Sequence, residues 1–171
     1  MRNSLRLAAV GAALAAASFA TSASAAATAT ATATAEVLSS LTLTADSALD
    51  FGLIAPNTGG TVSVNADNTV SQTGGLISTG TRLPAGFTVT GTNGASVVLT
   101  LPSAAVNLTN TTGTGGETMS LSGFNSNPVG AFQLSATTGQ ATFNVGGTLT
   151  VAANQVAGVY EGTFDVSVEY Q

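Results

Sequence analysis

The sequence contains no cysteine, no histidine, no tryptophan and no lysine. Without cysteine the chain can form no disulfide, do no thiol chemistry and carry no lipid anchor of the lipoprotein type. Without histidine or lysine, a serine or threonine nucleophile has no side-chain base to activate it. We therefore expect a protein that is not an enzyme and that binds no cofactor.

Positive charge is almost as scarce. Beyond the first 25 residues Arg82 is the single basic residue, against eight acidic residues, so this part carries a net charge of −7. A chain with one arginine cannot neutralise a phosphate backbone, and an anionic membrane surface would repel it. We expect no nucleic-acid partner and no membrane span in the mature chain.

The first 25 residues have the pattern of a bacterial secretory signal peptide. Arg2 and Arg6 form a short basic region, and the apolar stretch from Leu7 to Phe19 is too short for a comfortable membrane span. Ala23-Ser24-Ala25 matches the A-x-A cleavage pattern, which places the cut after Ala25; an uncleaved anchor is the alternative. The pattern predicts export, to the periplasm and then to the surface or medium of a Gram-negative bacterium.

Apolar residues then alternate with Thr, Ser and Asn almost everywhere, which is typical of half-buried antiparallel strands. Examples are Val62/Val64, Phe87/Val89, Val97/Leu99/Leu101, Met119/Leu121, Phe132/Leu134, Phe143/Val145 and Leu149/Val151. The spacing predicts an all-β fold for 37–171: a single antiparallel Greek-key or immunoglobulin-like β-sandwich of about nine to eleven strands. A closed barrel is the alternative.

Residue pairs that contain glycine separate or interrupt these runs. Asn93-Gly94 lies between two alternating runs and predicts a β-hairpin. Gly146-Gly147 interrupts a strand pattern and predicts a bulge or bend.

Acidic residues offer few alternatives to a purely structural role. Asp46 and Asp50 could form a glycosidase pair, and either of them or Asp67 could bind calcium through loop oxygens. However, no calcium-loop spacing is present, and sparse acids on a β-surface are usually solvating charges. We expect no metal.

The last residues, 158–171, alternate strictly. Tyr160, Phe164, Val166, Val168 and Tyr170 share one face of an extended strand, and acidic or hydroxyl residues share the other. A slip by one residue would bury three acids, so the register is firmly set. On pattern alone this is an edge strand whose outer charges discourage stray pairing.

The C-terminal stretch also resembles the ending of chaperone–usher pilins, with Tyr170 penultimate, Gly158 fourteenth from the end and alternation between them. The segment 49-LDFG-52 is similar to a motif of the archaic, spore-coat-U-like branch. Nearly the whole mature chain resembles a secreted bacterial domain family of unknown function, through LDFG, 84-PAGFTVTG-91, 145-VGGTL-149 and 158-GVYEGTFDVSVEY-170. Unlike many pilins, the chain has no cysteine pair, and its N-terminal extension offers alanine in place of bulky residues.

The pilin resemblance implies an incomplete immunoglobulin-like sandwich that a neighbour's N-terminal extension completes beside the C-terminal strand. Here that extension is the low-complexity segment 26–36. Its candidate donor residues share one parity: Ala27, Ala29, Ala31, Ala33, Ala35 and Val37. The segment could equally be a flexible spacer or a strand of its own domain. We expect Val37 to Thr44 to form the domain's first strand.

Together these patterns favour a non-enzymatic exported structural subunit, pilin-like, that forms a surface fibre by strand complementation. Its expected partners are further copies of itself, a periplasmic chaperone and an outer-membrane usher. The alternative is a monomeric periplasmic or secreted binding module for a glycan or a protein.

Overall fold

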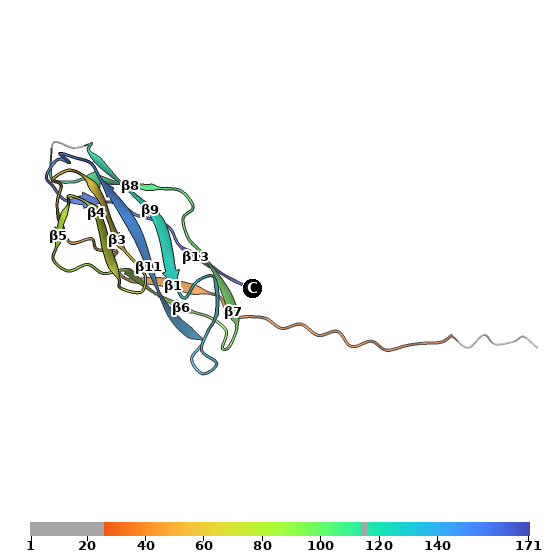
Figure 1. Ribbon diagram of the computed structural model, residues 1–171. Helices are drawn as coiled ribbons and strands as arrows, with labels where there is room; N and C mark the ends of the chain where they lie inside the picture. Colours follow the sequence, from red (N-terminus) through yellow and green to blue (C-terminus); the bar gives the residue numbers. More distant parts are fainter. Residues whose placement is uncertain (1–25, 114–115) are drawn as a thin grey trace, which may run out of the picture. The chain divides into compact units, whose positions relative to one another are not determined.

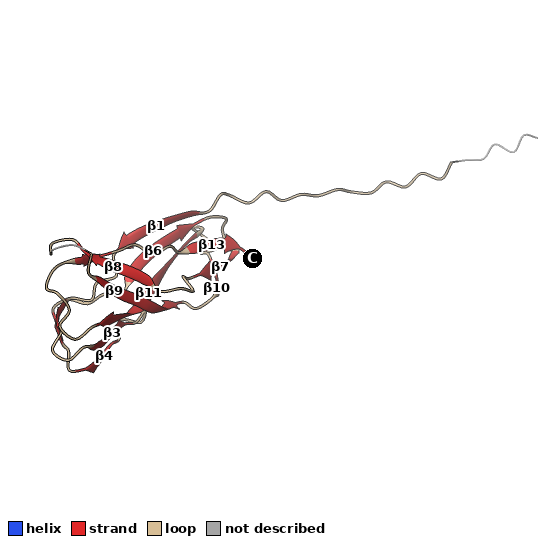
Figure 2. Ribbon diagram, turned by 90° about the horizontal axis from the view of Figure 1, so that it is seen from above, coloured by secondary structure: helices blue, strands red, loops and turns tan. Residues whose placement is uncertain are grey.

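The computed structural model describes residues 26–113 and 116–171, so the predicted signal peptide, 1–25, lies outside the described residues. The described residues form strands and no helix, which confirms the all-β prediction (Figures 1 and 2). They contain thirteen strands, more than predicted because four have only two or three residues. None of them forms a helix that could cross a membrane.

One large sheet holds eight strands. They are β1 (Thr42–Ser47), β3 (Gly60–Val64), β4 (Val70–Gly74), β6 (Ala85–Thr90), β8 (Val106–Asn110), β9 (Thr118–Asn127), β11 (Gln140–Val151) and β12 (Tyr160–Glu161). Their order is β1-β6-β11-β9-β8-β12, and β3 pairs with both β11 and β4. The long strand β11 organises this sheet, since one of its edges pairs with β6 and then with β3.

Two smaller sheets complete the fold. One has the order β10-β7-β13, formed by β10 (Ala131–Gln133), β7 (Ser96–Thr100) and β13 (Ser167–Tyr170). The other pairs β2 (Leu53–Ala55) with β5 (Ile77–Thr79). Every strand pairing is antiparallel, as predicted.

The core lies between β6 and β11 of the large sheet and β7 of the three-stranded sheet. Alternate residues along each strand point into it, and its buried members are Ala85, Phe87, Val89, Val97, Leu99, Leu134, Phe143 and Val145. Phe87 and Phe143 stack across the β6–β11 pair with ring centroids 5.2 Å apart. A second buried cluster packs β3 and β11 against Phe51 and Leu76. These contacts make the predicted sandwich.

The predicted hairpin at Asn93-Gly94 is wrong. Strand β6 before the turn belongs to the large sheet, and β7 after it belongs to the three-stranded sheet. Gly94 has a φ of 71°, and Ala95 N–H donates to Thr92 O, so a tight turn forms as the residue pair favours. The turn carries the chain across the sandwich because Val89 and Val97 bury their side chains against the same core.

The predicted irregularity at Gly146-Gly147 is present as a register shift between β11 and β9. Gly146 pairs with Asn125 and Thr148 pairs with Ser122, so β9 has one residue more than β11 over this interval. The extra residue therefore lies in β9, near Gly123. A Cβ on Gly146 would come 2.3 Å from Val64 O. Glycine is needed there because the neighbour of β11 changes from β6 to β3 at this point.

The first strand begins at Thr42, five residues later than predicted from the sequence. Residues 36–40 are exposed, and Leu41 and Leu43 are the first side chains that pack against the core. The error arose because alternation continues through Val37, although its side chain is 92% exposed. Residues 26–35 form no strand or helix and are all exposed; they belong to a separate unit that ends at Ala35.

Candidate functional site: an apolar groove and two open strand edges

Several described strands are paired on one edge only, and two of these edge strands, β1 and β13, lie at the two ends of the chain. In the described part of the chain β1 pairs with β6 alone, and β13 pairs with β7 alone. An immunoglobulin constant-type sandwich has strands A, B, E and D in one sheet and C, F and G in the other. Here β1, β6, β11 and β9 match A, B, E and D, and β7 and β13 match C and F. None of the described strands takes the place of G, beside β13.

An apolar groove lies between the segment after β1 and the C-terminal segment. Its narrow part has a volume of about 230 Å³, with Ala45, Leu49, Ala85, Phe87, Leu121 and Phe164 among its lining. Its wide part has a volume of about 540 Å³ and is lined by side chains that include Phe51, Ile54, Leu108, Met119, Leu149 and Tyr160. The two parts are continuous, because Ala48, Leu49, Phe51 and Leu108 line both.

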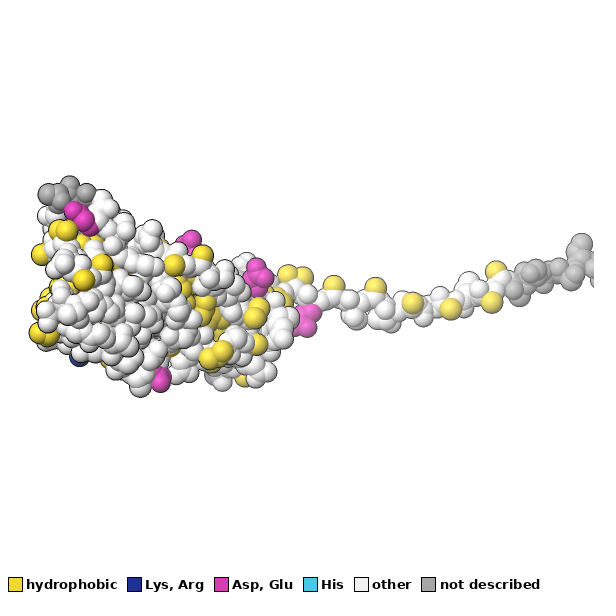
Figure 3. Space-filling model, turned by 45° about the horizontal axis from the view of Figure 1, so that its top comes forward, with side chains coloured by type: hydrophobic (Ala, Val, Ile, Leu, Met, Phe, Trp, Pro, Cys, Tyr) yellow, Lys and Arg dark blue, Asp and Glu magenta, His cyan; other side chains and the backbone are white. Residues whose placement is uncertain are grey.

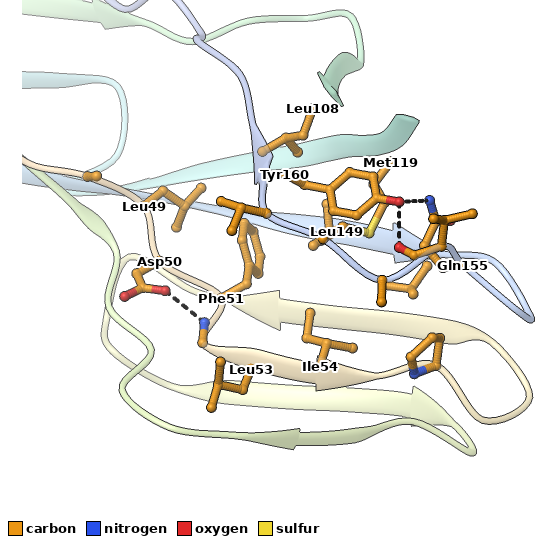
Figure 4. A pocket seen from close by; sticks show the side chains of 18 residues that line it. Leu49, Asp50, Phe51, Leu53, Ile54, Leu108, Met119, Leu149, Gln155 and Tyr160 are labelled. Carbon is orange, nitrogen blue, oxygen red and sulfur yellow. Dashed lines mark hydrogen bonds between the residues drawn. The ribbon is translucent and has the colours of Figure 1, made fainter. Parts of the chain in front are cut away.

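The wide part holds few polar groups (Figure 4). The Tyr160 hydroxyl donates to Val156 O and accepts from Gln155 Nε2, each at 2.8 Å. Asp50 Oδ1 accepts from Gly52 N–H at 2.8 Å, in a turn of its own segment. The groove can therefore bury apolar side chains, and its polar groups already have partners within the domain.

The C-terminal segment is two short strands in different sheets, which corrects the prediction of one continuous strand. Strand β12 pairs with β8, and five residues later β13 pairs with β7. A Cβ on Gly162 would come 2.8 Å from Asn107 O, so the segment passes close to β8 as it leaves the large sheet.

The predicted alternation along this segment is nevertheless present. Its inward residues are half-buried and every residue between them from Glu161 to Glu169 is exposed; the inward set is Tyr160, Phe164, Val166, Val168 and Tyr170. Phe164 packs edge-on to Phe87 and also lies 5.1 Å from Phe124, ring centroid to centroid. Of this set, Tyr160 lines the wide part of the groove and Phe164 lines the narrow part.

Tyr170 joins three parts of the domain through its hydroxyl. The hydroxyl accepts from Thr92 N–H and donates to Ser39 O, both at 2.7 Å. Ser39 N–H in turn donates to Thr92 Oγ1 at 2.7 Å. The residues before β1 are thereby attached at the Tyr170 end of the C-terminal segment, and Figure 1 shows β1 and the C-terminus close together.

Gly158 has a structural role that the sequence did not reveal. A Cβ at this position would come 2.3–2.6 Å from the side-chain atoms of Asn110, which is 4% exposed. The Asn110 amide donates to Ala157 O and accepts from Thr112 N–H and Gly113 N–H. Glycine thus leaves room for a buried side chain that holds two loops together.

The candidate donor residues Ala27, Ala29, Ala31, Ala33, Ala35 and Val37 are all exposed. The remaining sequence candidates, the aspartates, are used locally: Asp46 accepts from Thr88 Oγ1 at 2.6 Å, and Asp67 accepts from both Thr69 N–H and Thr69 Oγ1. The bonds from Thr69 lower the pKa of Asp67 below its ordinary value. Within residues 26–113 and 116–171 no three acidic residues gather as a metal site would need.

A family model described as a domain of unknown function (DUF4402) matches residues 41–170. The chain belongs to this family. The match runs from the start of β1 to the end of β13, so it includes both open strand edges and the residues that line the groove. It agrees with the predicted resemblance to a β-domain family of unknown function, while the pilin resemblance stays a prediction. None of the curated proteins and none of the solved structures matches the chain.

Sequence reasoning missed several groove residues of this DUF4402 domain. Leu49 and Phe51 belong to the LDFG segment, which the resemblance marked without a role. Leu108 and Met119 lie at inward positions of β8 and β9, where alternation indicates burial but cannot show which buried positions border a groove. Only the pairing of the strands shows that.

Proposed function

We propose that this DUF4402 domain is a non-enzymatic exported structural subunit, pilin-like, that is completed by a strand from a second copy and assembles into a surface fibre. The proposal rests on two observations: β1 and β13 each have an unpaired edge, and an apolar groove is lined by the end of β1 and by the residues that precede β13. An added strand would gain backbone hydrogen bonds from an open edge and would place alternate side chains in the groove.

The surface supports association with a neutral or weakly charged partner. Charged side chains are few and scattered in Figure 3, and apolar side chains are visible between uncharged polar ones. The acidic side chains of the C-terminal segment, Glu161, Asp165 and Glu169, point outward and are exposed. An incoming segment of alternating Ala and Thr brings no charge to be buried.

The free subunit would need protection before assembly. An open strand edge beside an apolar groove is a site of unwanted pairing. A periplasmic chaperone that covers the groove, and an outer-membrane usher that exchanges it for the next subunit, are the partners we propose. Export to the periplasm and then to the cell surface belongs to the same proposal.

The alternative, a monomeric periplasmic or secreted binding module for a glycan or a protein, has one supporting observation. The wide part of the groove, about 540 Å³, is within the size range of small-molecule sites and presents Phe51 and Tyr160. A binding module would use this pocket as a monomer, whereas a fibre subunit would fill it with another copy.

Material sheared from producing cells tests the proposal. Strand-completed fibres should run as a ladder in unheated detergent gels and collapse to one band on boiling. The matched control is the chain without residues 27–35, which should keep its melting temperature and run as a monomer. A single monomer band from cells that display the unaltered protein would contradict the proposal.

A further inference from the structure

The two parts of the groove need side chains of different size. The narrow part, about 230 Å³, has the less room and includes small residues such as Ala45, Ala48 and Gly162 in its lining, so it needs smaller side chains than the wide part does. The wide part, about 540 Å³, is more than twice as large. A strand of alanines laid across it would leave an empty apolar space, and such cavities are destabilising because their lining atoms lose contacts.

Large apolar side chains stand exposed beside the Ala/Thr segment. Val37 is 92% exposed and Leu38 is 43% exposed, just before the chain enters the domain. Val37 has the same parity as the alanines from Ala27 to Ala35. In an extended strand Val37 therefore points to the same side as those alanines, toward the groove if they do.

Val37 cannot reach the wide part of its own groove. Ser39 is attached to Thr92 and Tyr170, and from there β1 leads to Ala48 at the wide part. Nine residues of extended chain separate Ser39 from Ala48, roughly 30 Å, whereas two residues allow Val37 a reach of about 7 Å from Ser39. Any pocket of this kind that Val37 enters must belong to another copy.

We infer that Val37 of one copy occupies the wide part of the groove of the next copy and anchors the added strand there. This inference rests on the proposed function and adds the direction of the strand. With Val37 near Tyr160, the alanines lie past Phe164 and then beside the unpaired edge of β13 toward Tyr170, so the strand runs antiparallel to β13. From Ala27 to Val37 an extended strand has ten residue steps, about 33 Å, and the acceptor segment from Tyr160 to Tyr170 has the same number of steps.

The direction also yields an open head-to-tail polymer. Each copy's own extension leaves near its Tyr170. The strand that each copy receives comes from a neighbour positioned at its Tyr160 end. The donating and accepting surfaces therefore lie at opposite ends of the domain, and one copy can do both at once.

Single-cysteine variants test the inference cleanly, because the chain has no cysteine of its own. Pairs of variants are co-assembled from the full mature chain, oxidised and separated without reductant. We expect disulfide-linked dimers from Val37→Cys with Met119→Cys, and from Ala29→Cys with Val168→Cys. The matched control pairs, Ala29→Cys with Met119→Cys and Val37→Cys with Val168→Cys, should give none.

The outcomes separate this inference from the proposed function. Assembly with dimers only from the control pairs would overturn the inferred direction and leave strand addition intact. Assembly without dimers from any pair would overturn the inference as well. If the unaltered chain does not assemble at all, both the inference about Val37 and the proposed function are contradicted.

A second readout replaces one apolar side chain of the extension at a time with serine. Val37→Ser should weaken assembly about tenfold, the loss expected for one buried valine, and should not change the melting of the monomer because Val37 is exposed there. The matched change Ala29→Ser should leave assembly close to that of the unaltered chain. Equal assembly for Val37→Ser and the unaltered chain would count against the anchor.

Discussion

Tyr170→Phe removes one oxygen atom and keeps the aromatic ring. The lost hydroxyl accepts from Thr92 N–H and donates to Ser39 O. Each hydrogen bond contributes about 0.5–1.5 kcal/mol net, so the variant should lose about 1–3 kcal/mol of unfolding free energy. Tyr170→Ala also loses a half-buried ring, and half of the 3–5 kcal/mol typical of a buried aromatic raises the loss to about 2.5–5.5 kcal/mol.

Urea unfolding followed by circular dichroism measures both losses. Amide hydrogen exchange adds a local readout: residues 36–41 should exchange faster in Tyr170→Phe because Ser39 loses one of its attachments. Tyr160→Phe is the matched control, since its hydroxyl also makes two hydrogen bonds but to the neighbouring Gln155 and Val156. It should leave exchange at 36–41 unchanged.

This role of the Tyr170 hydroxyl is refuted if Tyr170→Phe is as stable as the unaltered chain within about 0.5 kcal/mol and exchange at 36–41 stays slow. That result would mean that the core contacts of Leu41 and Leu43 alone attach the start of β1.

Three further predictions concern other parts of the domain. Removing 159–171 should unfold it, because the half-buried side chains of Phe164, Val166, Val168 and Tyr170 alone contribute about 3–6 kcal/mol of a total near 5–15 kcal/mol; a cooperative melt of the truncated chain would contradict this. Gly158→Ala should lower the melting temperature by displacing the Asn110 side chain, and it should cost less in an Asn110→Ala background, where that side chain is absent; equal losses in the two backgrounds would refute the steric conflict. The hydrogen bonds from Thr69 lower the pKa of Asp67, so they stabilise the folded state above the ordinary pKa of 3.8. This contribution is lost as the pH falls through the lowered pKa. In an NMR titration, Thr69→Val should raise the pKa of Asp67, and an unchanged pKa would refute the role of Thr69.

Much of the fold could be predicted because burial follows the period of two. Val62, Val64, Phe87 and Val89 are buried as their alternation indicates. Alternation shows which face of a strand is inward, but not which strand lies beside it. The turn at Asn93-Gly94 illustrates this, since its residues favour a tight turn whether the next strand pairs with the last one or crosses to the other sheet.

The groove could be predicted only in outline. The C-terminal alternation identified the side chains from Tyr160 to Tyr170 that face inward, but the break between β12 and β13 depends on pairing with β8 and β7, far away in the sequence. The Ala/Thr segment remained open to three interpretations because its small side chains specify no register. The structure adds the two unpaired edges that make the donor-strand interpretation testable.

Hydrogen exchange of assembled material tests strand addition most directly. On assembly, protection should appear in 26–38 and at those amides of 162–170 that do not already pair with β7. In monomers of the chain that lacks 27–35, these amides of 162–170 and the remaining residues of the first segment should exchange rapidly. Protection at both segments, lost together on boiling, is the predicted result. Assembled material in which 26–38 exchanges as fast as a free peptide would contradict the account.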